Sequence, residues 1–123
     1  MATLNDRVFD NGLTVLDTEA NRIDVTSQEA TSYAEATSTY TLGNSTSLSI
    51  GAPADRSGGG REVTVAAISD GSISGTGTAT HYALVDTSNS RLLATGSLSA
   101  SQSVTSGNTF TLASFTIGIP DPS

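Results

Sequence analysis

The chain has 123 residues, a net charge of −7 at pH 7 and no cysteine, lysine or tryptophan. Five scattered arginines cannot form the basic surface that phosphate binding needs, so the composition excludes nucleic acid and an anionic membrane as partners. The absence of cysteine excludes disulfides and thiolate sites. Serine and threonine fill 38 positions. We expect one mainly β domain over residues 1–123, with these short side chains on its outer faces.

The N-terminal residues predict a helix over about residues 3–18. Thr3 is a suitable N-cap, and Asp6 follows it near the positive end of the helix. Apolar side chains recur at helical spacing at Phe9, Leu13, Leu16 and Ala20. Gly12 disfavours the helix. The first residues contain neither a basic region nor an apolar run, so we expect no signal peptide, and no stretch reaches the roughly 20 apolar residues of a membrane span.

Short elements follow the helix. Residues 22–27 alternate as in a strand, with Ile23 and Val25 directed inward and polar side chains outward. Residues 31–36 fit one helical turn, and residues 45–50 alternate again.

The middle of the chain is rich in turn signals. Residues 51–60 form the clearest loop, since they contain a proline and a run of glycines. Residues 62–68 predict a strand whose inner face carries Val63, Val65 and Ala67. Asp70-Gly71 is a strong hairpin-turn signal. Residues 72–86 predict a long strand or a bent pair, in which glycines mark the close approach of another backbone.

The last third predicts turns at residues 87–90 and 106–108, with a strand over residues 91–98 between them. Residues 109–119 close the sheet. Their apolar phase slips near Ala113, which predicts a β-bulge or a crossing between two sheets. Short strands separated by such turns are typical of an antiparallel β-sandwich, here with a short N-terminal helix.

Few residues suggest chemistry. His81 is the only histidine and is expected to share a strand face with Ala79 and Ala83. This position favours a partly buried or surface strand histidine over a catalytic one, which needs a nucleophile or an orienting carboxylate beside it. Asp6 and Asp10 lie one helical turn apart with no further ligand pattern, which favours a solvated acidic helix face over a metal site.

The remaining motifs favour structural roles. The sequence GGGR at residues 58–61 lacks the ending of a phosphate loop and favours a flexible loop tip. Phe110 and Phe115 are expected in the core. The sequence does not decide whether Tyr33 and Tyr40 are buried or exposed. We therefore assign no catalytic, cofactor-binding or metal-ligating residue, and we expect no cofactor and no enzymatic activity.

Three segments resemble small proteins encoded among the virion structural genes of tailed phages and prophages. They are residues 7–20 (RVFDNGLTVLDTEA), residues 80–86 (THYALVD) and residues 91–112 (RLLATGSLSASQSVTSGNTFTL). The resemblance implies a β-sandwich that is made in the host cytoplasm and assembles onto a virion. It carries over no site residue. The chain has no repeats or heptads, which argues against a long trimeric fibre.

The expected function is therefore structural. We expect a capsid decoration (cement) protein that binds the major capsid protein or other virion proteins and forms a homo-oligomer. The alternative is a tail or baseplate component involved in host attachment. A third hypothesis is a small hydrolase or lectin for envelope sugars that uses Asp6, Asp10 and His81. Nine acidic residues lie at or before Glu62 and three after it, so an acidic surface and a neutral docking surface are both expected.

Overall fold

The computed structural model describes the backbone of residues 6–119, and the side chains from Gly12 onward except that of Ser99. Residues 6–119 form two antiparallel sheets, with the strand orders β7-β6-β1-β2-β5-β8 and β3-β4-β9. Their bounds are β1 (Arg22–Thr26), β2 (Thr41–Ser45), β3 (Ala54–Asp55), β4 (Arg61–Val65), β5 (Ile68–Ile73), β6 (Gly77–Asp86), β7 (Arg91–Val104), β8 (Thr109–Leu112) and β9 (Phe115–Ile119). The predicted mainly β, antiparallel fold is confirmed, and the two sheets are consistent with a sandwich.

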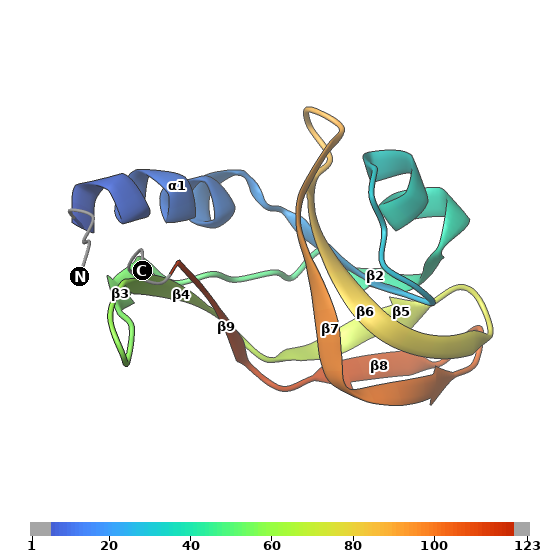
Figure 1. The fold of residues 1–123 in the computed structure, drawn as a ribbon. Helices are drawn as coiled ribbons and strands as arrows, with labels where there is room; N and C mark the ends of the chain where they lie inside the picture. The colour runs from blue at the N-terminus through green and yellow to red at the C-terminus, as the bar shows by residue number, and fades with distance from the viewer. Residues whose placement is uncertain (1–5, 120–123) are drawn as a thin grey trace.

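The predicted N-terminal helix is confirmed as α1 (Asp6–Glu19); residues 3–5 of the prediction lie outside the described residues. Figure 1 shows α1 lying beside the three-stranded sheet at one end of the molecule, where it contacts β4. Leu13 and Leu16 are buried, while Gly12 is exposed. Burial of an apolar helix face outweighs the poor helix propensity of one glycine, so α1 continues through Gly12.

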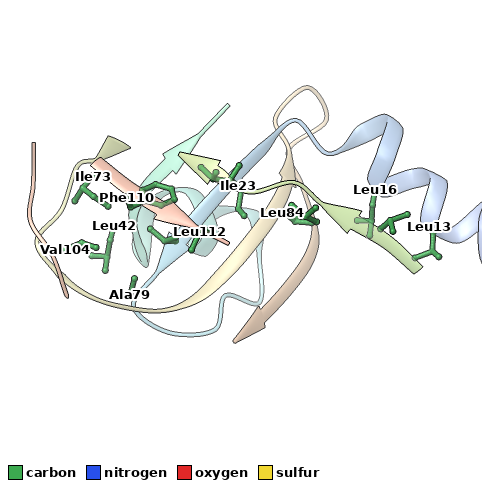
Figure 2. Packing of buried hydrophobic residues seen from close by; sticks show 14 residues of the cluster. Leu13, Leu16, Ile23, Leu42, Ile73, Ala79, Leu84, Val104, Phe110 and Leu112 are labelled. Atoms are coloured by element: carbon green, nitrogen blue, oxygen red, sulfur yellow. The ribbon is translucent and has the colours of Figure 1, made fainter. Parts of the chain in front are cut away.

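One apolar cluster joins the helix to both sheets. Figure 2 shows it running from Leu13 and Leu16 on α1, past Leu84, to Leu42 and Phe110 at the far end of the six-stranded sheet. The three-stranded sheet contributes two fully buried valines of β4, Val63 and Val65. The predicted inner face of residues 62–68 is thus confirmed for these valines.

Strand β1 is buried on both faces, which corrects the expectation that its polar side chains face solvent. Asp24 and Thr26 are fully buried, as are Ile23 and Val25. The segment 28–40 covers the second face, and its side chains pack in a separate apolar cluster. That cluster contains Ala30, Ala36, Ala83 and Val85, with Tyr33, Tyr40 and Leu92 partly buried against it. The helical turn predicted at residues 31–36 lies at residues 33–39 and includes the π-helix η1 (Glu35–Thr39).

The strand predicted at residues 45–50 is wrong in its position. Strand β2 ends at Ser45, and Ile50 makes only an isolated bridge to Val65 among the described residues. Strand β2 contains Gly43 where it pairs with both β1 and β5. A Cβ atom at Gly43 would collide with the carbonyl oxygen of Ser72. Strand pairing therefore requires a glycine here, although glycine usually disfavours a strand.

The turn predicted at Asp70-Gly71 is also wrong, because both residues lie inside β5. Asp70 accepts hydrogen bonds from Ser45 Oγ at 3.0 Å and Ser47 Oγ at 2.6 Å. The break between strands comes earlier, between the end of β4 and the start of β5. It divides the strand predicted for residues 62–68 into two. Ala67, expected to face inward, lies in this break and is exposed.

The end of the chain confirms the predicted crossing between two sheets. Strand β8 pairs with β5 in the six-stranded sheet, whereas β9 pairs with β4 in the three-stranded sheet. The change takes place at residues 113–114, where the apolar phase slips. The turns predicted at residues 87–90 and 106–108 are confirmed. A short connection therefore joins the two sheets directly beside the edge strand β8.

Candidate functional site

The open edges of the two sheets are formed by one uncharged segment. Strands β7 and β8 end the six-stranded sheet, and β9 ends the three-stranded sheet. Residues 92–119, which form almost all of these three strands, contain no charged side chain. The remaining edge strand of the described residues, β3, carries Asp55 in an ion pair with Arg61 at 2.7 Å. Natural sheet edges are commonly protected by charges, and apart from Arg91 at the start of β7 these three edges have no such protection.

A cleft of about 320 Å³ lies between β7 and the connection from β8 to β9. Figure 1 shows β7 and β8 close to one another at the lower side of the curled sheet. All the lining residues are uncharged, and all but Tyr82 belong to the segment 92–119. They are Tyr82, Ser97, Leu98, Ala100, Gln102, Leu112, Ala113, Ser114, Phe115 and Thr116.

A bulge of several residues in β7 forms one wall of the cleft. Ala79 pairs with Gln102 and His81 pairs with Ser97, so residues 98–101 of β7 all lie opposite Thr80 of β6. These four residues interrupt the regular pairing of β7 with β6. Bulges redirect side chains and end regular pairing at functional edges. Here the bulge places Leu98 and Ala100 in the cleft wall.

The aromatic side chains of Tyr82 and Phe115 form an apolar part of the cleft. Their ring centroids are 4.5 Å apart and the ring planes are inclined by 46°. Tyr82 pairs across the strands with Gly96, and a Cβ atom at Gly96 would lie 2.5 to 2.7 Å from atoms of the tyrosine side chain. The glycine thus provides the space that the Tyr82 side chain occupies. Burial raises the pKa of the Tyr82 hydroxyl, which stays protonated at neutral pH.

A side-chain hydrogen bond crosses from one open edge to the other. The Nε2 amide of Gln102, on β7, donates to the main-chain carbonyl oxygen of Thr111, on β8, at 3.3 Å. Strands β7 and β8 are not neighbours in the hydrogen-bonded sheet order. A glutamine amide therefore takes the place that a main-chain N–H of an added strand would take at Thr111.

His81 lies beside this cleft on β6 but does not line it. The hydroxyl of Thr80 donates to the carbonyl oxygen of Ser27 at 3.0 Å and lies 2.8 Å from His81 Nδ1. Ala79 belongs to the main core, whereas Ala83 packs in the separate cluster on the other face. His81 pairs with Thr26, and Ala83 pairs with Asp24 on the same face of β1. The predicted shared face of His81 with Ala79 is therefore wrong.

The other predicted site residues are not brought to the cleft. Asp6 and Asp10 lie on α1, and their side chains are outside the described part of the structure. Residues 58–60 form the tip of the β3–β4 hairpin, with φ values of 89°, 108° and 93°. Arg61 Nη1 binds Asp55 at 2.7 Å and its Nη2 donates to Pro53 O at 3.3 Å. Both contacts hold the hairpin together.

A buried ionic group lies elsewhere in the sheet, on β1. Asp24 accepts two hydrogen bonds from Arg22, at 2.8 and 2.9 Å, and one from Thr41 Oγ1 at 2.6 Å. Burial raises the pKa of Asp24, although these hydrogen bonds act in the opposite direction. Because the carboxylate is fully buried and its partners come from β1 and β2, the group links these two strands and offers no access to a ligand.

The described residues contain no group of three histidine, aspartate or glutamate side chains placed to hold a metal ion. Nor does any helix among residues 6–119 combine the length and apolar character needed to cross a membrane. The cleft was not predicted as a site. The sequence signal that could have found it is the long run without charge from residue 92 to residue 119.

Comparison of the chain with protein-family models, with curated protein sequences and with solved structures found no match.

Proposed function

We propose that the protein is a non-enzymatic structural protein of a tailed-phage virion, a decoration protein that docks on the major capsid shell. The observation that carries this proposal is the use of one uncharged segment, residues 92–119, for three open sheet edges. Open edges offer main-chain donors and acceptors to another protein chain. The resemblance of residues 7–20, 80–86 and 91–112 to virion structural proteins supports a phage particle as the partner.

The distribution of charge suits a protein that must stay dispersed before it docks. All 12 acidic side chains and all five arginines lie outside residues 92–119. Contacts through an uncharged edge require no charge to leave water, which removes one large cost of protein association. The net charge of −7 makes free subunits repel one another. Repulsion between free copies then opposes premature pairing of their edges.

Copy number in purified particles tests the proposal. A decoration protein is expected in amounts comparable to the major capsid protein, measured by quantitative mass spectrometry of intact virions. Purified protein added to particles that lack it should bind until the shell sites are filled. A handful of copies per particle, with antibody labelling confined to the tail tip, would replace the decoration function with the tail or baseplate function.

A further inference from the structure

We propose that the cleft between β7 and the β8–β9 connection binds an extended, uncharged segment of a partner capsid subunit, which adds as a strand to the open edge of β8. This inference rests on the proposed function, because it names the chemistry by which the protein would dock. The occupant is defined by three features of the cleft: the free main-chain edge, the apolar wall and the absence of charge.

The main-chain edge is the first feature. Within residues 6–119, strand β8 has one hydrogen-bonded neighbour strand, β5, and its other edge faces β7. On that edge the carbonyl oxygen of Thr111 already accepts a hydrogen bond, but from the side-chain amide of Gln102 at 3.3 Å. This bond is long for an N–H···O contact, and a main-chain N–H of an added strand can replace it. Gln102 then turns toward solvent at the rim of the cleft.

The wall of the cleft gives the second feature. Tyr82, Leu112 and Phe115 supply apolar surface, whereas Ser97, Ser114 and Thr116 supply hydroxyl groups. A strand presents alternate side chains to opposite sides. A segment in which apolar residues alternate with small polar residues therefore matches the cleft, with its apolar side chains against the aromatic rings and its polar ones toward the rim.

The third feature is the absence of charge in the lining. A charged side chain in the occupant would lose hydration without gaining an opposite charge. The same lining makes a free phosphate or a charged sugar an unsuitable ligand. The β7 bulge at residues 98–101 interrupts the regular ladder with β6, and its Leu98 and Ala100 line the cleft of about 320 Å³ that would take the added backbone.

A synthetic probe tests the cleft directly. The probe is a short, end-blocked peptide of alternating threonine and valine, titrated into isotope-labelled protein and followed by NMR. Binding should shift the amide signals of Thr111, Ala113 and Phe115 and slow the hydrogen exchange of β8. The matched control is the same peptide with every backbone nitrogen methylated, which removes all of its main-chain donors. Equal binding of both peptides would overturn the added-strand geometry.

Two neighbouring variants separate the cleft from the rest of the surface. Ala100 lines the cleft and Ser101 does not, and both side chains are exposed on the same bulge. Ala100→Glu should weaken peptide binding at least about tenfold, because a charge enters the site. Ser101→Glu adds the same charge and should leave binding unchanged. Unfolding curves of both variants confirm that they are folded. Equal affinities for the two variants would overturn the proposal.

Binding to purified capsid shells distinguishes this inference from the proposed function. If the unmodified protein and Ser101→Glu bind shells while Ala100→Glu does not, the cleft is the docking site. If all three bind shells equally, the capsid function stands and the cleft inference is overturned. If the peptide binds as expected but no form of the protein binds shells or whole particles, the cleft inference is supported as a peptide site and the capsid function is overturned.

Discussion

Gly71 on β5 lies beneath the aromatic ring of Phe110 on β8, and the two residues are directly opposed in the strand register. A Cβ atom at residue 71 would overlap the Cδ1, Cε1 and Cζ atoms of that ring. Phe110 is 3% exposed and belongs to the main core. The glycine therefore lets the ring lie flat against the backbone of β5, and it sets how closely β5 and β8 approach.

Gly71→Ala should lower the free energy of unfolding by about 1–3 kcal/mol, the usual effect of adding volume to a packed core. The ring of Phe110 must move, and the neighbouring core side chains move with it. Urea unfolding followed by circular dichroism measures the effect. Gly51→Ala is the control, since the nearest atom to its added Cβ is 4.0 Å away. Equal unfolding midpoints for the two variants would contradict the proposed steric role of Gly71.

Gly12→Ala should act in the opposite direction and stabilise the protein by about 0.5–1 kcal/mol, because glycine in a helix interior is less favourable than alanine. Gly12 is exposed on α1. Its added Cβ would lie 3.6 Å from Ile119 Cδ1, an ordinary van der Waals distance. Thermal unfolding should show a higher midpoint. A lower midpoint would mean that α1 and β9 are packed too closely to accept a methyl group.

Two aspartates that pair with arginine should differ strongly in their effect on stability. Asp24→Ala removes the fully buried carboxylate to which Arg22 and Thr41 donate, and it should cost about 3–5 kcal/mol. Asp55 makes a similarly short ion pair with Arg61, but its side chain is 89% exposed. Asp55→Ala should cost about 0–1 kcal/mol. Chemical denaturation of both variants measures the difference, and similar losses would show that burial does not decide the value of these pairs.

Asp70→Asn should reduce stability at neutral pH and lose this effect in acid. Hydrogen bonds from Ser47 and Ser45 lower the pKa of Asp70 in the folded protein. The folded state therefore binds a proton less readily than the unfolded state, so the stabilisation is present above the ordinary aspartate pKa and is lost as pH falls through the folded-state pKa. Denaturation at a series of pH values measures this.

Ser47→Ala should reproduce part of the Asp70→Asn effect, because it removes one of the two hydroxyl groups that donate to Asp70 and leaves that of Ser45. Thr46→Ala changes the exposed neighbouring residue and serves as the control. A loss of stability from Asp70→Asn that is the same at all pH values would assign the effect to packing instead of ionisation.

Local sequence signals predicted the elements whose form is decided by nearby residues. The helix α1, the strand β1 and the turns at residues 87–90 and 106–108 follow from spacing and turn chemistry. The phase slip near Ala113 correctly predicted the crossing between sheets. Each of these features depends on residues close together in the chain.

The failures arise where distant residues decide the structure. Asp70-Gly71 is a common turn sequence, but Gly71 lies within β5. Its lack of a Cβ atom makes room there for the ring of Phe110. Asp24 occupies a polar position in an alternating strand pattern, which predicts exposure. The segment 28–40 covers this face of the sheet, so Asp24 is buried. The cleft depends on a bulge of β7 opposite Thr80, and a strand register of this kind has no local signal in the sequence.

If the protein docks through the uncharged segment 92–119, as proposed, the attachment should depend little on salt concentration. Dissolved ions weaken contacts between exposed charges, because they screen them beyond about 10 Å at 0.1 M ionic strength. Main-chain hydrogen bonds and apolar contacts made by this segment contain no charge for such ions to screen. Under the proposed decoration function, attached copies would stay on the particle when it is carried between fresh and saline water.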